Sequence, residues 1–363
     1  MGLLAQHLSL VDFRNFESLE LELGDGVTIL VGPNASGKTN TVEALQLLTT
    51  GSSFRKPTPK QLVREGAECG RASVRLAGDG RIIDVSCDVK TGRKAFTRNG
   101  KHCQAQEVSG TLLSILFSPD DLMMVKGGAS YRRDEIDGFG RQAAKGYANL
   151  MAAYAHAIEQ RNRLLKEPYI DSDLLDAWDV SVARGGASLL SARLRLLGRL
   201  TPRIESAYVD ISGGEMLTCT YICSLGDEIQ GRSRDELTQL MLNRLIENHE
   251  EDIRRQMTCV GPHRDDVLFE VDGRDARNFA SQGQQRSIVL AIKVAEVGLA
   301  EEVCGQRPLL LLDDVMSELD ATRRAAVMGL AGEGIQTIVT TTNLGYFDDG
   351  VLQSAKVVHF GMG

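Results

Sequence analysis

The chain has 363 residues, and at about 150 residues per domain this length indicates two lobes rather than one core. Its apolar and charged fractions, 42% and 25%, are those of a globular chain and exclude a largely disordered one. The 41 basic and 49 acidic residues give a net charge of −8, so a nucleic acid partner would need a local basic patch.

The cysteines and the N-terminus indicate an intracellular protein. The seven cysteines are scattered, none forms a C-x-x-C pair, and Cys219 and Cys223 have no histidine nearby to complete a zinc site. Reduced structural thiols are therefore expected. The first residues lack the basic segment of a signal peptide, and no apolar run approaches the ~18 residues of a membrane helix. We expect a cytoplasmic protein with no membrane segment.

Strand patterns dominate the first hundred residues. The first thirty alternate between apolar and polar residues, and 27–31 is a continuous apolar run, typical of a strand buried on both faces. A helix is predicted at 41–48. The alternation returns at 72–98, and Asn99 with Gly100 then gives the two-residue signal of a hairpin turn.

The middle of the chain has helical periodicity. Between about 130 and 210, apolar residues recur every three to four positions. Pro168 is expected to end the first of these helices, and Pro202 to start or kink another segment. Beyond it, the patterns predict a strand at 216–224, a helix at 233–255 and a strand at 266–271.

Helices and strands alternate again in the last part of the chain. Helices are predicted at 284–303 and 321–330, and buried strands at 308–312 and 335–340, the second being the last core strand. Strands and helices at both chain ends thus enclose a helical insertion. The expected architecture is an α/β head with a mixed sheet, formed by 1–130 and 260–363, with an inserted, mostly helical lobe at 131–259.

A phosphate-binding loop follows the apolar run at 27–31. Residues 32–39, GPNASGKT, fit the pattern G-x-x-x-x-G-K-[ST], with a strand before them and a helix after them. Glycines let backbone N–H groups wrap a phosphate, Lys38 offers an ammonium group to the β and γ oxygens, and Thr39 offers a hydroxyl to Mg²⁺. The alternative is a surface loop that fits by chance. The predicted nucleotide-binding residues are Gly32, Pro33, Asn34, Ala35, Ser36, Gly37, Lys38 and Thr39.

Two carboxylates, Asp313 and Asp314, follow the apolar strand at 308–312. A phosphate-bound Mg²⁺ needs an acidic ligand at the carboxyl end of a neighbouring strand, which Asp313 supplies. Asp314 could orient or deprotonate the attacking water, a role worth about 10²–10⁴ in rate. The alternative is that the two acids only cap the next helix.

A polar segment at 281–286, SQGQQR, opens the helix predicted at 284–303. Its hydroxyl, its glycine and the helix N-terminus would suit an anion. An ordinary helix cap fits the bare pattern equally well. The order of the motifs favours a site, because the acidic strand follows within thirty residues and SELD at 317–320 comes after it.

Together these motifs resemble the ATP-binding-cassette ATPases, and most of all the branch with split heads to which SMC and RecN proteins belong. Within that branch the chain is similar to a family of bacterial recombination mediators. The resemblance covers almost the whole length. The stretches that carry it, besides the motifs above, are 13–16, 39–40, 43–44, 53–55, 117–122, 160–165 and 261–266.

The resemblance implies an ABC-ATPase-like P-loop head that binds ATP and Mg²⁺. Residues 32–39 would be the Walker A loop, Thr39 and Asp313 the Mg²⁺ ligands, and Lys38 and Asp314 the catalytic residues. A signature motif would touch the γ-phosphate of ATP held by another chain, so that a homodimer encloses two ATP molecules. The residues of that motif would be Ser281, Gln282, Gly283 and Gln284.

The resemblance also implies a role in recombinational repair, replication restart and SOS induction. The protein would be a weak, DNA-stimulated ATPase that acts mainly as a switch. Its dimer would close as a clamp on double-stranded, single-stranded or junction DNA, and would help to load RecA together with RecR and RecO. The inserted lobe would carry part of the DNA and dimer surface.

Some residues depart from the family's pattern. Asp314 is one methylene shorter than the usual glutamate, which predicts slow hydrolysis. Ala35 and Ser36 replace a glycine-rich pair, and both are expected to keep negative φ. The segment 118–121 has no glutamine where a Q-loop is expected, and 340–343 has no histidine where transporter-type members carry one.

Residues 141–204 are the least acidic part of the chain, with ten Lys/Arg and six Asp/Glu, a net charge of +4. Arg195, Arg199 and Arg203 are spaced i, i+4 and i+8, and would share one helical face if Pro202 does not break the helix. Such a stripe could contact DNA phosphates without reading sequence. A solvated helix face is the ordinary alternative.

Two other functional classes stay open. The nucleotide-binding subunit of a membrane transporter carries its signature much closer to its Walker A loop, whereas here 281 − 37 = 244 positions separate Gly37 from Ser281. A P-loop kinase or GTPase needs no SQGQQR segment, and the N-K-x-D guanine reader is absent from the sequence.

Overall fold

The structure, a computed structural model, describes residues 2–90, 92–227, 229–332 and 334–361. It divides into two compact units, Met1–Asp121 with Val289–Gly363, and Leu122–Ile288. Both contain helices and strands, so the predicted α/β class is confirmed. The predicted inserted lobe, 131–259, falls within the second unit, and its limits as a domain stay a prediction.

A five-stranded parallel sheet forms the centre of the first unit. Its strands are short and almost wholly buried, which explains their continuous apolar runs. The prediction that 335–340 is the last core strand was wrong, because a further strand pairs with β3; it is only four residues long and half-exposed, so its sequence carries little signal. In order the strands are β14 (Lys356–His359), β3 (Val27–Val31), β13 (Thr337–Thr341), β12 (Leu309–Asp313) and β8 (Ser114–Phe117).

A six-stranded antiparallel sheet is the other β element of this unit. Asn99 and Gly100 have φ of 50° and 74°, so the predicted two-residue hairpin turn is confirmed. The strand order is β2 (Phe16–Glu22), β1 (Leu4–Phe13), β4 (Cys69–Gly78), β5 (Arg81–Lys90), β6 (Arg93–Arg98) and β7 (Lys101–Cys103).

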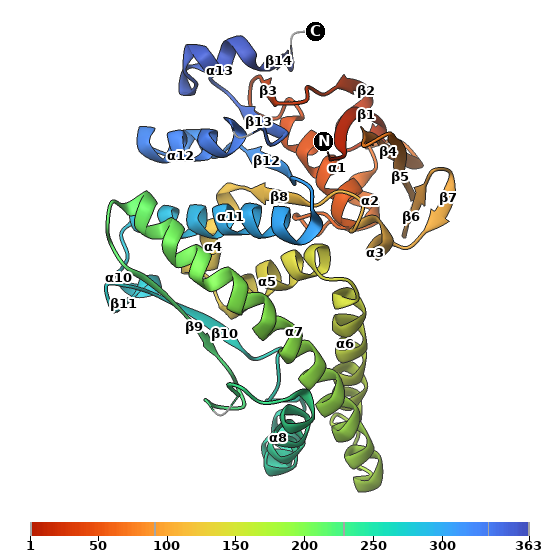
Figure 1. The fold of residues 1–363 in the computed structure, drawn as a ribbon. Helices are drawn as coiled ribbons and strands as arrows, with labels where there is room; N and C mark the ends of the chain where they lie inside the picture. Colours follow the sequence, from red (N-terminus) through yellow and green to blue (C-terminus); the bar gives the residue numbers. More distant parts are fainter. Residues whose placement is uncertain (1, 91, 228, 333, 362–363) are drawn as a thin grey trace. The chain divides into compact units, whose positions relative to one another are not determined.

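Helix α1 (Lys38–Thr50) joins the two sheets into one core. It packs against β12, β13 and β8 of the parallel sheet and against β4 and β5 of the antiparallel sheet (Figure 1). Both faces of the helix are therefore buried, and Leu45, Leu47 and Leu48 are fully enclosed. The other helices of this unit are α2 (Pro59–Leu62), α3 (Ala105–Val108), α12 (Ala321–Gly332) and α13 (Asp349–Ser354), with the 3-10 turns Pro119–Leu122, Val315–Ser317 and Leu344–Tyr346.

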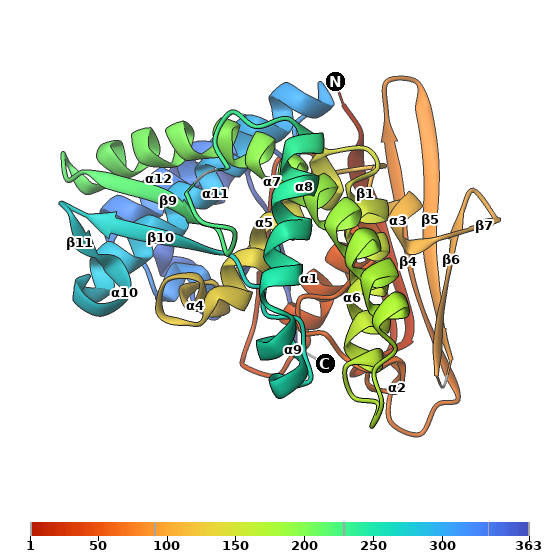
Figure 2. The same cartoon turned by 90° about the horizontal axis from the view of Figure 1, so that it is seen from below.

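The second unit is mainly helical. Its longest helix, α7 (Ser172–Ser212), packs against α6 and α8 (Figure 2). The remaining elements are α4 (Met123–Lys126), α5 (Ala129–Ala143), α6 (Tyr147–Leu164), α8 (Arg234–Glu247), α9 (His249–Arg255), α10 (Ala276–Phe279) and the antiparallel sheet β11 (Arg274–Asp275), β10 (Asp266–Val271), β9 (Leu217–Ile222). Helix α11 (Gln282–Cys304) begins in this unit and continues in the first.

Two predictions about these helices were wrong. Pro202 neither starts nor ends a segment, because α7 runs through it. The proline is exposed while Leu200 and Ile204 beside it are buried, so packing holds the helix together where a hydrogen bond is lost. The single helix predicted at 233–255 is divided at Asn248, which ends α8 and precedes α9.

A buried polar network holds the loop that leads into β10. The Arg193 guanidinium donates to Asp137 at 2.9 and 3.1 Å, to the Tyr221 hydroxyl at 3.1 Å and to the carbonyl of Pro262 at 2.8 Å. Tyr221 in turn donates to Asp265 at 2.6 Å. The stretch 261–266, quoted above only for its resemblance, is thus fixed from several sides.

A second buried guanidinium, that of Arg161, fastens the helices of the same unit. It donates to Asp179 and to Asp252, each at 2.6 Å, and to the Thr258 hydroxyl at 2.9 Å. These residues come from α6, α7, α9 and the loop after it, so one side chain joins four segments. Among the helices of the described residues, none combines the length and apolar composition needed to span a bilayer.

Candidate nucleotide site

The loop at 32–37 connects β3 to α1 and needs glycine at both ends. At Gly37 φ is 104°, and a Cβ there would lie 2.4 Å from the ring of Phe16. At Gly32 a Cβ would lie 2.5 Å from the carbonyl oxygen of Phe360. Close approach of neighbouring chain, as well as backbone conformation, therefore requires the two glycines of the pattern.

Ala35 corrects one expectation about the loop. Its φ is 65°, in the left-handed region, whereas a negative value was expected. The loop has to turn there to bring its N–H groups round to one side, and alanine adopts this conformation at a cost of about 1–2 kcal/mol. Such strain is often kept at ligand-binding loops.

The ammonium group of Lys38 lies against the loop itself. Nζ donates to the carbonyls of Gly32 and Pro33, both at 2.7 Å, and the side chain is buried. Burial lowers the pKa of Lys38, while the charges of Asp314 and Asp313 oppose that effect. A phosphate bound in the loop would offer this ammonium a stronger acceptor than a backbone carbonyl.

Asp313 ends β12, and its side chain is only 5% exposed. Its Oδ1 accepts a hydrogen bond from Thr340 on the adjacent strand β13 at 2.8 Å. Burial raises the pKa of this carboxyl, opposed by hydrogen bonds from Thr340 and Thr39 and by the charge of Arg55. Thr39 and Asp313, the predicted Mg²⁺ ligands, therefore lie together.

Asp314 lies just beyond the strand, at a φ of 53°. Its N–H donates to the Thr340 hydroxyl at 2.9 Å, so one threonine fixes both aspartates. Burial raises the pKa of Asp314, while the charge of Lys38 lowers it. The structure thus brings the loop, Lys38, Asp313 and Asp314 to the carboxyl ends of β3 and β12.

One buried hydroxyl supports a phosphate ligand. The Oγ of Ser36 is enclosed and has no hydrogen-bond partner among the residues that the structure describes. Buried polar groups are normally paired, so an unpaired one in a glycine loop at a helix N-terminus is best explained by an anionic ligand. The residues at 32–39, with Asp313, fit a nucleoside triphosphate and its Mg²⁺.

A charged cluster beside the loop was missed by the sequence interpretation. Glu43 of α1 is fully buried and accepts two hydrogen bonds from Arg14, at 2.6 and 2.9 Å, and one from Ser53 at 2.5 Å. Arg55 lies 3.6 Å from the same carboxylate and donates to Asn40 at 2.8 Å. These residues lie in stretches quoted for their resemblance, but nothing in their spacing indicates that they meet.

The signature segment belongs to the second unit, where Ser281 precedes α11. The Gln284 N–H donates to Ser281 Oγ at 3.2 Å, and the Ser281 N–H donates to Gln284 Oε1 at 2.8 Å. This reciprocal capping is the helix cap that the sequence left open. It does not exclude an anion site, because a capping hydroxyl that accepts from the helix still has its own proton to donate.

Three other side chains have the spacing of a metal site in the second unit. Ligand atoms of Asp176, Asp179 and His249 lie within 4.8 Å of one another. Arg161 already donates to Asp179, and His249 contacts the same carboxylate at 2.5 Å. Because a guanidinium neutralises the buried carboxylate, this cluster is an ion-pair network, and the magnesium prediction stays with Thr39 and Asp313.

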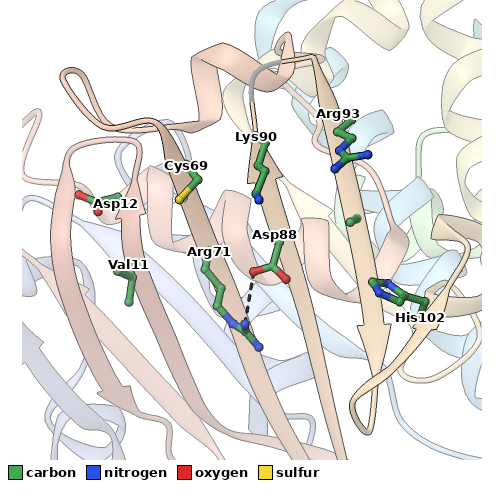
Figure 3. A pocket seen from close by; sticks show the side chains of 10 residues that line it. Val11, Asp12, Cys69, Arg71, Asp88, Lys90, Arg93 and His102 are labelled. Carbon is green, nitrogen blue, oxygen red and sulfur yellow. Dashed lines mark ion pairs between the residues drawn. The ribbon is translucent and has the colours of Figure 1, made fainter.

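A groove of about 490 Å³ lies on the outer face of the six-stranded sheet (Figure 3). Its walls carry Arg71, paired with Asp88 at 3.3 Å, and Asp12, paired with Arg64 at 2.7 Å. No residue predicted to bind nucleotide lines it. An antiparallel sheet commonly leaves one face in water, and paired surface charges are typical of such a face.

Comparisons with known proteins bear on the whole chain. Residues 4–359 match the family described as "RecF/RecN/SMC N terminal domain". A DNA replication and repair protein RecF from Gloeobacter violaceus is 38% identical over 97% of this chain and 95% of its own length. The protein of the same name from Symbiobacterium thermophilum is 41% identical over 93% and 91%.

A solved structure agrees with these relatives. The recombination mediator protein RecF with ATP, described as part of the RecFOR pathway, is 32% identical and superposes with a TM-score of 0.89. The match covers 96% of this chain and 94% of that one. Neither the transporter nor the kinase and GTPase alternative gains support from these similarities.

Proposed function

Since the chain belongs to the RecF/RecN/SMC family and, within it, to RecF, we propose that it is an ATP-dependent DNA-binding protein of DNA replication and repair. The observation that supports this most directly is the loop at 32–39, where a buried hydroxyl and a buried ammonium face the carboxyl edge of a parallel sheet. The nucleotide of the similar structure, ATP, is the proposed ligand.

The proposed nucleotide chemistry uses the residues described above. N–H groups of 32–39 would wrap the phosphates, and Lys38 would leave the loop carbonyls for the β and γ oxygens. Thr39 and Asp313 would hold Mg²⁺, which neutralises phosphate charge when bound. Asp314 would orient the attacking water, and its short side chain predicts slow hydrolysis.

The proposed switch is a homodimer that forms with ATP. Ser281, Gln282, Gly283 and Gln284 of one chain would complete the nucleotide site of the other, so that each ATP joins two chains. Hydrolysis would release the dimer rather than drive a motor. This makes the protein a weak ATPase whose turnover, stimulated by DNA, resets a clamp.

DNA and protein partners complete the proposal. Helix α7 is continuous through Pro202, so Arg195, Arg199 and Arg203 share one helical face, on which Arg195 and Arg199 are exposed. This stripe would contact phosphates of gapped, double-stranded, single-stranded or junction DNA. We further propose a cytoplasmic role with RecR and RecO in loading RecA during recombinational repair, replication restart and SOS induction.

Sedimentation velocity with and without Mg-ATP, alone and with gapped DNA, tests the proposal. We expect wild-type protein to be monomeric without nucleotide and dimeric with it. Lys38→Met should stay monomeric because it cannot bind ATP, whereas Ser281→Arg should bind ATP and still stay monomeric. A wild-type chain that binds Mg-ATP but never dimerises would overturn the switch.

A further inference from the structure

A carboxylate contacts the signature segment from the end of the long helix. Helix α7 ends at Gly213 and Gly214, with φ of 78° and 120°, so the chain turns at once and places Glu215 before strand β9. Glu215 Oε1 accepts a hydrogen bond from Gln284 Nε2 at 2.9 Å. This contact joins the signature to a part of the chain about seventy residues away from it.

The other oxygen of the same carboxylate is held in place. Glu215 Oε2 accepts a hydrogen bond from the Tyr208 hydroxyl at 2.9 Å, and Tyr208 is fully buried in the last turns of α7. A buried aromatic side chain has little rotational freedom. Glu215 is therefore anchored on one side by the rigid core and presents its second oxygen to Gln284.

The carboxylate decides which way the Gln284 amide faces. An ionised carboxylate only accepts hydrogen bonds, so it selects the Nε2 group of the glutamine and turns Oε1 to the other side. There Oε1 accepts from the Ser281 N–H at 2.8 Å. A glutamine at 215 could present its own N–H₂ group instead, and the Gln284 amide would then have reason to turn over.

The orientation of Gln284 determines what Ser281 can donate. Ser281 Oγ accepts from the Gln284 N–H at 3.2 Å, so its own proton points away from the helix. Within the described part of the chain, no acceptor takes that proton. Ser281 is exposed and is thus ready to donate to an acceptor that arrives from outside.

We propose that Glu215 is a positioning residue for the composite nucleotide site: it fixes Gln284, and through it the Ser281 hydroxyl, in the orientation that donates to the triphosphate held by a second copy of this chain. The inference rests on the proposed ATP-dependent dimer. It adds a residue outside every nucleotide-binding motif, and it links the signature to α7, the helix that carries the arginine stripe.

Three substitutions and a matched control test this role. Glu215→Ala removes both hydrogen bonds, Glu215→Gln keeps the size but not the acceptor-only character, and Tyr208→Phe removes only the anchor. Glu205→Ala is the control, because Glu205 also lies near the end of α7 and accepts from the Cys219 N–H at 3.0 Å without touching the signature. Thermal melting of each variant reports whether it folds.

Two readouts separate positioning from structure: ATP affinity of the single chain, measured with a fluorescent ATP analogue, and the dissociation constant of the Mg-ATP dimer, measured by sedimentation. Glu215→Ala should leave ATP affinity unchanged and weaken the dimer about tenfold, the effect of losing one hydrogen bond to a charged group. Glu215→Gln and Tyr208→Phe should weaken it by about threefold, and Glu205→Ala should not change it.

The outcomes distinguish this inference from the function on which it rests. If wild-type protein dimerises, Ser281→Arg does not, and both folded Glu215 variants dimerise as tightly as wild type, the positioning role is wrong and the dimer proposal stands. If wild-type protein stays monomeric with Mg-ATP, both are wrong. Loss of ATP affinity in Glu215→Gln would also overturn the role, because the residue would then act on the single chain.

Discussion

The buried charges of the two units behave in opposite ways. In the second unit, burial lowers the pKa of Arg193, but Tyr221 and Asp137 outweigh it and hold the pKa above its ordinary value. In the first unit, burial lowers the pKa of Lys38, and the charges of Asp314 and Asp313 do not outweigh it. The guanidinium has partners in place, whereas the ammonium faces backbone carbonyls.

The difference separates a scaffold from a site. Buried charges that complete one another, such as Arg193 and Asp137, fix the positions of loops and helices. Buried groups without a full complement, such as Lys38, Asp313 and the Ser36 hydroxyl, are arranged for a ligand. One Nη2 of Arg161 also has no hydrogen-bond partner among the described residues, but its other nitrogens are paired with two carboxylates.

Breaking the scaffold should have the largest effect on stability. Arg193→Met leaves Asp137 buried without its cation, which typically costs about 3–5 kcal/mol. The measurement is the free energy of unfolding from urea titration. The control is Arg75→Met, which removes an exposed pair with Asp84 and should change stability by no measurable amount. Equal losses in the two variants would show that the Arg193 network is not a scaffold.

Breaking the site should affect the ligand and spare the fold. Lys38→Met should weaken ATP binding about 100-fold, because hydrogen bonds from a charged group to the phosphates are lost. Its melting temperature should stay at or above that of wild type, since a buried ammonium is removed. Titration with a fluorescent ATP analogue and thermal melting check both. A fall in melting temperature with unchanged affinity would reverse the assignment.

The arginine stripe of α7 should have a smaller effect, on DNA alone. Arg195→Glu combined with Arg199→Glu should weaken DNA binding at low salt and reduce the salt dependence of the binding constant by about two phosphate contacts. Arg234→Glu on α8, also an exposed position, is the control. Fluorescence anisotropy at several salt concentrations gives the slopes. Unchanged affinity in the double variant would leave the stripe as a solvated helix face.

The smallest expected effect is a gain in stability at Asp313. Its pKa is raised in the folded chain, so the ionised form costs stability, and that cost grows as pH rises from 3.8 through the raised value. Asp313→Asn should therefore melt about 2 °C above wild type at pH 7, with the difference shrinking towards pH 4. Mg²⁺ should no longer improve its ATP affinity. A variant that melts below wild type at pH 7 would contradict this reading.

Local patterns predicted those parts of the fold where sequence and environment agree. The strand at 266–271 has its predicted limits because its residues alternate between buried and half-buried, and the loop at 32–39 lies between a strand and a helix as its spacing requires. The hairpin at 99–100 follows from two residues that tolerate positive φ. In each of these cases a few neighbouring residues contain the whole signal.

The remaining features depend on contacts between distant residues. Pro202 lies inside a helix because buried neighbours pack on both sides of it, and β14 forms because β3 offers an edge. Glu43 meets Arg14 and Arg55 only after the chain has folded. Glu215 likewise reaches Gln284 across about seventy residues. Sequence spacing carries none of these pairings, so resemblance could point to the stretches but not to their roles.

The most direct test of the central claim mixes two inactive chains. Lys38→Met keeps an intact signature and lacks ATP, whereas Ser281→Arg binds ATP and lacks the signature, so neither should dimerise alone. Mixed with Mg-ATP, they should form a heterodimer with one complete site and one bound ATP per two chains, seen by sedimentation with one chain labelled. A mixture that stays monomeric while wild-type protein dimerises would show that the signature of one chain does not complete the nucleotide site of another.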